Sequence, residues 1–241
     1  FQPIVDAEGR LVGAESLLRW HHPRRGRVPP GEFITLCEES GLILEVGDWV
    51  LGEALSHMVR WRHRGLMREG QYLSVNISPR QFRQRDFVEL LIQRVEAAGV
   101  SPSQLALEIT EGSVIGDSDD TLLNLQRLRT AGFRLLIDDF GVGYSSLSYL
   151  KRLPVHGIKI DQSFVRDIGS DPSDAALVQS LITIGTHFKL GVIAEGVETE
   201  QHSSLLRDMG CGYFQGYYFD RPQPGEAFEA RWLLQRSSHE V

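Results

Sequence analysis

Short apolar runs alternate with longer amphipathic segments along almost the whole chain. Several of the short runs are apolar throughout, which is typical of strands that are covered on both faces. The strand-like runs are Phe1–Val5, Leu11–Leu18, Leu73–Ile77, Leu105–Ile109, Arg134–Asp138, Gly157–Ile160, Gly191–Ala194 and Tyr213–Phe219. Between them, apolar residues at helical spacing predict helices. The clearest of these are Phe87–Ala98, Thr121–Ala131, Ala175–Phe188 and Thr199–Met209.

The alternation of strands and helices predicts a mostly parallel sheet. Eight strands in a chain of 241 residues fit an α/β fold, a TIM-like (β/α)₈ barrel formed by a single domain over residues 1–241. The first two strands are the exception, because only a few residues around Asp6 to Gly9 separate them. So short a connection makes a hairpin, whose strands are antiparallel. We therefore predict a barrel with one antiparallel strand.

Polar residues gather at the C-terminal ends of the predicted strands, where barrels of this kind hold their active sites. They are Glu15, Asn76, Glu108, Asp138, Asp139, Lys159, Asp161 and Glu195. Each one alone is explained at least as well by a structural role, such as capping the next helix. Together, so many carboxylates at one barrel mouth would repel each other strongly unless cations offset their charge.

Divalent metal ions would supply that positive charge. A ligand set made only of oxygen atoms suits Mg²⁺ or Mn²⁺ rather than zinc or copper. Asp138 and Asp139 are adjacent in the sequence, which suits two ions that share one bridging carboxylate. Sites of this kind activate water for the displacement of a phosphoester.

The overall charge limits the class of ligand. The formal net charge is −7 at pH 7, which argues against binding of DNA or RNA polymers and against contact with anionic membranes. A small anionic ligand is still compatible with this charge once metal ions are bound. Two isolated cysteines, Cys37 and Cys211, form no disulfide framework, so a cytoplasmic location is expected.

Seven motifs stand in order along essentially the whole chain: GAESLLRW, SVNISPRQF, LEITE, IDDFGVGYSSLSYL, IKID, IAEGVE and QGYYF. Together they resemble the EAL-domain family of bacterial phosphodiesterases, which act on the second messenger cyclic di-GMP. The resemblance implies hydrolysis to linear 5′-pGpG by water activated between two Mg²⁺ or Mn²⁺ ions. The chain begins at Phe1 rather than at Met and goes straight into a strand-like segment, so we expect a domain cut from a longer signalling protein, with sensory, GGDEF-type or inner-membrane segments upstream.

The resemblance assigns roles to individual residues. The metal ligands would be Glu15, Asn76, Glu108, Asp138, Asp139 and Glu195, with Asp138 bridging. The catalytic set would be Lys159, which holds the attacking water, together with Glu195, Gln215 and Glu15. The substrate contacts would be Gln2, Arg19 and Asp161. Glu111 would anchor the loop at residues 140–149, through which a homodimer is expected.

An alternative function is that of a cyclic di-GMP receptor with little or no turnover, because some members of the family have lost metal ligands. Every expected ligand is present here, which favours an enzyme. Three residues depart from the family pattern. Ser16 replaces the alanine of the name motif, and little effect is expected because its side chain should point away from Glu15 in the strand. Val142 lies in the loop and puts its ordering in question, while Asp220 stands where serine is common and is expected to change only a turn.

Overall fold

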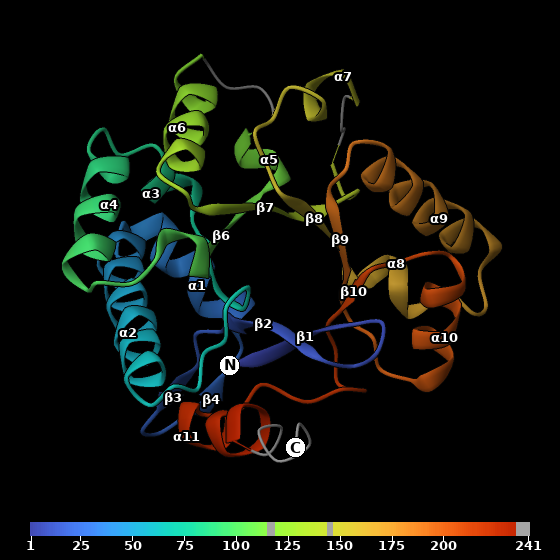
Figure 1. Ribbon diagram of the computed structural model, residues 1–241, viewed down its shortest axis with the longest axis horizontal. Helices are drawn as coiled ribbons and strands as arrows, with labels where there is room; N and C mark the ends of the chain where they lie inside the picture. The colour runs from blue at the N-terminus through green and yellow to red at the C-terminus, as the bar shows by residue number, and fades with distance from the viewer. Residues whose placement is uncertain (115–118, 144–146, 235–241) are drawn as a thin grey trace.

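The computed structural model describes residues 1–114, 119–143 and 147–234 of the chain. Within this part, strands close into a barrel in the order β1-β10-β9-β8-β7-β6-β5-β2, with the helices arranged around it (Figure 1). The barrel strands are β1 (Gln2–Asp6), β2 (Leu11–Ser16), β5 (Tyr72–Ile77), β6 (Leu105–Thr110), β7 (Arg134–Phe140), β8 (Gly157–Ile160), β9 (Gly191–Ala194) and β10 (Tyr213–Phe214).

The first strand, β1, is the antiparallel strand of the barrel. It pairs antiparallel with β2 and with β10, whereas the other neighbouring pairs of barrel strands are parallel. The β1–β2 turn is held by the Asp6 carboxylate, which accepts the backbone N–H groups of Glu8 and Arg10. The predicted α/β barrel with one reversed strand is thus confirmed.

The helices of the described residues include counterparts of all four predicted ones, namely α4, α6, α9 and α10. The bounds are α1 (Pro30–Ser40), α2 (Ile43–His63), α3 (Pro79–Phe82), α4 (Phe87–Ala97), α5 (Glu111–Val114), α6 (Asp119–Thr130), α7 (Leu147–Leu150), α8 (Gln162–Arg166), α9 (Pro172–His187), α10 (Glu200–Asp208) and α11 (Gly225–Phe228), with a 3₁₀ turn η1 (Pro102–Gln104) and a π-helical segment η2 (Glu229–Leu234). None of these helices is long and apolar enough to cross a membrane.

Two parts of the fold differ from the apolar pattern. A small hairpin of β3 (Trp20–His22) and β4 (Gly26–Val28) was not predicted, because most of its residues are polar and exposed. The last strand was predicted over Tyr213–Phe219, but it ends at Phe214. From Gly216 onward the chain turns instead, and the backbone N–H of Phe219 donates to the Gly216 carbonyl.

The interior of the barrel has an apolar layer below a polar one. Because successive side chains of a strand alternate between its two faces, every second residue points into the barrel. The apolar layer consists of Ile4, Tyr72, Ala106, Leu136 and Ile193. Two positions nearer the mouth, the inward residues are polar: Gln2, Glu15, Ser74, Glu108, Asp138, Lys159, Glu195 and Gln215. Strand period therefore gathers seven of the candidate residues into one layer: Gln2, Glu15, Glu108, Asp138, Lys159, Glu195 and Gln215.

Replacement of Gly216 by alanine should destabilise the barrel. A Cβ at this position would lie 2.6 Å from the carbonyl carbon of Val197, and closer still to that residue's backbone oxygen and nitrogen. Backbone atoms cannot rotate away, so we expect a loss of about 3 kcal/mol in the free energy of unfolding, the upper part of the overpacking range. Urea denaturation measures it. The matched control is Gly212→Ala, whose Cβ would meet nothing within 4 Å, and equal stability of the two variants would contradict the expectation.

Candidate active site

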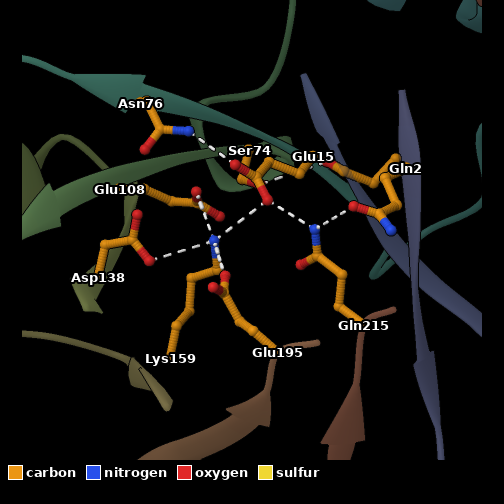
Figure 2. Close-up of polar contacts among 10 residues, drawn as sticks. Gln2, Glu15, Ser74, Asn76, Glu108, Asp138, Lys159, Glu195 and Gln215 are labelled. Atoms are coloured by element: carbon orange, nitrogen blue, oxygen red, sulfur yellow. Dashed lines mark hydrogen bonds and ion pairs between the residues drawn. The ribbon is translucent and has the colours of Figure 1, made fainter. Parts of the chain in front are cut away.

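Lys159 lies at the centre of the polar layer, and its side chain is 1% exposed. Its Nζ atom lies 3.2 Å from Oε2 of Glu15, 2.8 Å from Oε2 of Glu108, 3.3 Å from Oδ1 of Asp138 and 2.5 Å from Oε1 of Glu195. Figure 2 shows these carboxylates converging on the ammonium group from strands β2, β6 and β7 and from the end of β9. Four separate strand ends thus meet at one cation.

Amide side chains hold Glu15 from two sides. Nδ2 of Asn76 donates to Oε1 of Glu15 at 2.7 Å, and Nε2 of Gln215 donates to Oε2 at 2.6 Å. The same Gln215 nitrogen lies 3.2 Å from Oε1 of Gln2, which is paired with Glu15 in the β1–β2 register. Glu15 is therefore fixed in orientation before any ligand binds, and the antiparallel strand contributes to that by bringing Gln2 to the mouth.

The cluster carries more negative than positive charge. Burial alone would lower the pKa of Lys159, but attraction to the surrounding carboxylates raises it well above its usual value, so the ammonium stays protonated. Burial and repulsion from Glu15 raise the pKa of Glu108. Burial likewise raises the pKa of Glu195 to about 8, against the attraction of Lys159. For Glu15, burial is outweighed by Lys159 and the two amide donors, and its pKa is lowered.

Asp139 and Asp161 lie beside the cluster rather than in it. Asp139 has an exposed side chain and a left-handed backbone with φ of 53°. Partial burial and repulsion from Asp138 and Asp161 raise its pKa to about 6. Asp161 caps α8, because its Oδ1 accepts the backbone N–H of Ser163 at 2.9 Å. The structural role considered for carboxylates at strand ends therefore applies to Asp161.

Glu111 is buried at the start of α5, directly after β6, and its carboxylate contacts the loop that follows β7. Its Oε2 accepts the backbone N–H of Gly141 at 2.9 Å, and a Cβ on Gly143 would lie 2.7 Å from its Oε1. Val142, between these two glycines, is exposed. Residues 144–146 of the predicted dimerisation loop lie outside the described residues. Up to Gly143, the contacts agree with an anchoring role for Glu111.

Arg19 stands apart from the carboxylates, at the junction of two cavities. One cavity has a volume of about 430 Å³ and is also lined by Trp49, His57 and Pro222. The other has a volume of about 290 Å³ and reaches Asn76. The guanidinium of Arg19 is partly buried and donates only to the carbonyl of Leu18 among the described bonds. It can therefore offer its remaining N–H groups to an anion.

The side chains fit divalent cations in chemistry and charge. Within residues 1–114, 119–143 and 147–234, no three Asp, Glu, His or Cys side chains are arranged to hold a metal ion. The Lys159 ammonium lies between the carboxylates. The atoms of the proposed ligands that could coordinate a metal are nevertheless all oxygens, which suit Mg²⁺ or Mn²⁺. Oε1 of Glu108 is buried and has no hydrogen-bond partner among the described bonds. Burial, and after it repulsion from neighbouring carboxylates, raises the pKa of Glu108 and the pKa of Glu195 against the attraction of Lys159.

One residue of the polar layer was missed by the sequence reasoning. Ser74 is fully buried beside Glu15, and its hydroxyl lies 3.4 Å from the carbonyl of Ala14. Its position on β5, two residues before Asn76, is the signal that could have identified it, since both side chains share the inward face of the strand.

Comparison with known proteins identifies the family. The EAL domain model matches residues 1–222. MucR of Pseudomonas aeruginosa, a bifunctional diguanylate cyclase/cyclic di-GMP phosphodiesterase, is 41% identical over 94% of this chain, which spans only 33% of the length of MucR. A solved structure of the PaMucR phosphodiesterase in complex with c-di-GMP superimposes with a TM-score of 0.90 at 40% identity, covering 94% of this chain and 92% of the other. The EAL enzyme Bd1971, in its form bound to cAMP and cyclic di-GMP, has a TM-score of 0.89 at 35% identity and covers 94% and 62%. The chain belongs to the EAL domain family, whose members include cyclic di-GMP phosphodiesterases.

Proposed function

We propose that this chain is a metal-dependent phosphodiesterase that hydrolyses cyclic di-GMP to linear 5′-pGpG. The observation that carries the proposal is the convergence of four carboxylates on Lys159 at the mouth of the barrel, with Asn76 and Gln215 holding Glu15. The similarity to the PaMucR complex supports cyclic di-GMP as the substrate.

The carboxylate cluster is the proposed cofactor site. The residues that would hold two Mg²⁺ or Mn²⁺ ions are Glu15, Asn76, Glu108, Asp138, Asp139 and Glu195. When bound, such ions lower the pKa of water and offset charge on a phosphoryl group. The protein's part is to bring the carboxylates of Glu15, Glu108, Asp138 and Glu195 together at the mouth of the barrel. Hydrogen bonds from the side-chain amides of Asn76 and Gln215 fix Glu15 from both sides.

Lys159 is proposed to orient the attacking water. Because its pKa is raised by the carboxylates, Nζ keeps three protons and cannot act as a base. A charged donor fixed at the centre of the mouth can hold a hydroxide or water by donating to its lone pair, and it offsets charge that develops at the reacting phosphate. Glu195, 2.5 Å from Nζ, keeps the ammonium in place.

The substrate is proposed to lie across Arg19 and its two cavities. Their volumes of about 430 and 290 Å³ suit groups of small-ligand size. Trp49 and His57 supply flat walls for a purine base in the larger cavity. Gln2 and Asp161, near the mouth, are proposed as further substrate contacts. The guanidinium of Arg19 would then meet a phosphate between the two bases.

Arg19→Met should therefore lower kcat/KM for cyclic di-GMP by roughly 10- to 100-fold, the range that follows from losing a hydrogen bond to a charged group. Initial rates at several substrate concentrations measure the effect. Arg24→Met is the matched control, because Arg24 is exposed and lines neither cavity. Equal kinetics of the two variants would remove Arg19 from the substrate site.

The function is tested by incubating the protein with cyclic di-GMP and Mg²⁺ or Mn²⁺, and by separating the products chromatographically. We expect pGpG, and no product when a chelator is present. The receptor function is the alternative, and one observation favours it: the Lys159 ammonium already lies among the carboxylates that would hold metal. Tight binding of cyclic di-GMP without product in any metal would support that alternative.

The setting of the domain also remains a proposal. We propose that residues 1–241 form one catalytic domain of a longer cytoplasmic signalling protein, and that it forms a homodimer through the loop at residues 140–149. A GGDEF-type neighbour is supported by the relative MucR, which is described as a diguanylate cyclase as well as a phosphodiesterase. Size-exclusion chromatography with light scattering tests the dimer.

A further inference from the structure

Asp220 lies just beyond β10 and was expected to change only a turn. In the structure it is buried, 7% exposed, and its carboxylate accepts four donors. Oδ1 accepts the backbone N–H of Arg221 at 2.9 Å and Nε2 of Gln223 at 2.8 Å. Oδ2 accepts Nε1 of Trp232 at 2.8 Å and pairs with Nε of Arg231 at 2.9 Å. So many partners indicate a fixed structural centre rather than a surface turn.

The backbone carbonyl of Asp220 leads from this centre into the active site. It accepts Nε2 of Gln2 at 3.1 Å, in a buried contact. The other end of the same amide, Oε1 of Gln2, faces Nε2 of Gln215 at 3.2 Å. Nε2 of Gln215 also donates to Glu15 at 2.6 Å. The two amides thus form a continuous chain of hydrogen bonds from Asp220 to Glu15, and Figure 2 shows its part from Gln2 onward.

This chain has only one consistent direction. A carbonyl group can only accept, so the Asp220 carbonyl requires the NH₂ end of the Gln2 amide, and that leaves Oε1 of Gln2 facing Gln215. Gln215 must then present its own NH₂ group, which has two protons, one for Gln2 and one for Glu15. The reversed amide would place an oxygen against the Glu15 carboxylate. The Asp220 carbonyl at one end and the Glu15 carboxylate at the other therefore require the same orientation of both amides.

We propose that Asp220 is a positioning residue for Glu15, acting through Gln2 and Gln215, and that it draws the segment carrying Arg231 and Trp232 into the active-site framework. That segment lies beyond residue 222, where the match to the EAL domain model ends. The chain therefore supports its active site from a segment outside the family match. Residues that orient a metal ligand from outside typically affect activity or metal affinity 10- to 100-fold.

The first test is a spectroscopic one, which requires no turnover. In a protein labelled with ¹⁵N-glutamine, Asp220→Ala should shift the side-chain amide signals of both Gln2 and Gln215. The matched control is Glu229→Ala, which removes a buried carboxylate from the same C-terminal segment. Glu229 pairs with Arg60 and Arg64 on the α2 side, and its described ion pairs include neither Gln2 nor Gln215. The control should leave both signals in place, and equal shifts in the two variants would reduce Asp220 to a general anchor of the segment.

The second test is kinetic and rests on the proposed hydrolase function. Asp220→Ala should lower kcat/KM for cyclic di-GMP about tenfold, the lower limit of that range because Asp220 acts through two intervening amides. Glu229→Ala should leave it within a factor of two. Adding Asp220→Ala to Gln2→Ala should lower kcat/KM no further, because the effects of substitutions within one hydrogen-bond network are not additive. If the loss in kcat/KM of the double variant equals the product of the two single losses, the proposal is overturned.

Two further outcomes are decided by the same set of variants. If Asp220→Ala does not fold, Asp220→Asn replaces it, since it keeps one carbonyl oxygen for Trp232 or Arg221. The Asp220→Asn variant should still shift the side-chain amide signals of Gln2 and Gln215 relative to the wild type. Signals at their wild-type positions would contradict the proposal. If the wild-type protein shows no turnover while the amide signals shift as expected, the positioning role stands and the hydrolase function fails.

Discussion

Asp138→Asn should lower the rate of cyclic di-GMP hydrolysis about 1,000-fold or more, which corresponds to a loss of roughly 4 kcal/mol of transition-state stabilisation. Asparagine keeps the shape of the side chain and an oxygen for Lys159, 3.3 Å away, but it removes a negative charge from the proposed bridging position. Initial rates of pGpG formation with saturating Mg²⁺ or Mn²⁺ measure the loss. Asp167→Asn is the control, because Asp167 is paired only with the neighbouring Arg166 among its described ion pairs.

The same variant should remain folded, and in the absence of metal it should be at least as stable as the wild type. Asp138 raises the pKa values of Glu108 and Glu195 by repulsion, in addition to their burial, so its removal relieves both. Urea denaturation in a chelator measures this directly. An inactive variant that had also lost stability would attribute the effect to unfolding, and a fully active one would contradict the assignment of Asp138.

Lys159→Met should destabilise the metal-free protein by about 3–5 kcal/mol near pH 8, the usual cost of removing one partner from a buried ion pair. The variant leaves Glu15, Glu108, Asp138 and Glu195 facing each other in a closed layer. The pKa values of Glu108 and Glu195 are already raised by burial, and Lys159 opposes that rise, so they should rise further without it. A protein in which the folded pKa of a carboxyl lies above its unfolded pKa loses stability as the pH rises. The loss should therefore be smaller at pH 5 than at pH 8.

Metal ions distinguish this charge effect from a packing effect. If the carboxylates of the Lys159→Met variant are the proposed ligands, Mg²⁺ or Mn²⁺ should recover a large part of the lost stability at pH 8, because ligands that bind only the folded state stabilise it. Denaturation curves with chelator and with metal measure the difference. A loss that neither pH nor metal changes would mean that Lys159 contributes packing alone.

Much of the fold was predictable because the apolar period of the strands and the lengths of the connections between them are local properties of the sequence. The apolar runs gave the eight barrel strands, and the short connection after Asp6 gave the reversed one. The polar layer followed from the position of Glu15, Asp138 and Lys159 at strand ends. The truncation at Phe214 was not predictable from the apolar pattern, because it results from the close contact of Gly216 with the backbone of Val197, a residue on another segment.

The contacts between the residues of the site were harder to predict than the identity of those residues. The strand pattern predicted Lys159 at the mouth of the barrel, but its contacts with four carboxylates at 2.5–3.3 Å depend on side-chain orientation. Asp161 was expected to belong to the same site, yet its carboxylate caps helix α8. The effect of Asp220 depends on partners more than 200 residues earlier in the chain, since Gln2 is separated from it by 218 positions. No local pattern in the sequence records such a contact.

The most direct measurement of the central claim is the rate of pGpG formation by chelator-treated protein as Mg²⁺ or Mn²⁺ is added back. We expect no turnover at the start, a rate that rises with metal to saturation, and a return to zero when excess chelator is added. Formation of pGpG at full rate in the continued presence of chelator would contradict a metal-dependent mechanism. Binding of cyclic di-GMP with no product at any metal concentration would contradict the proposed phosphodiesterase function.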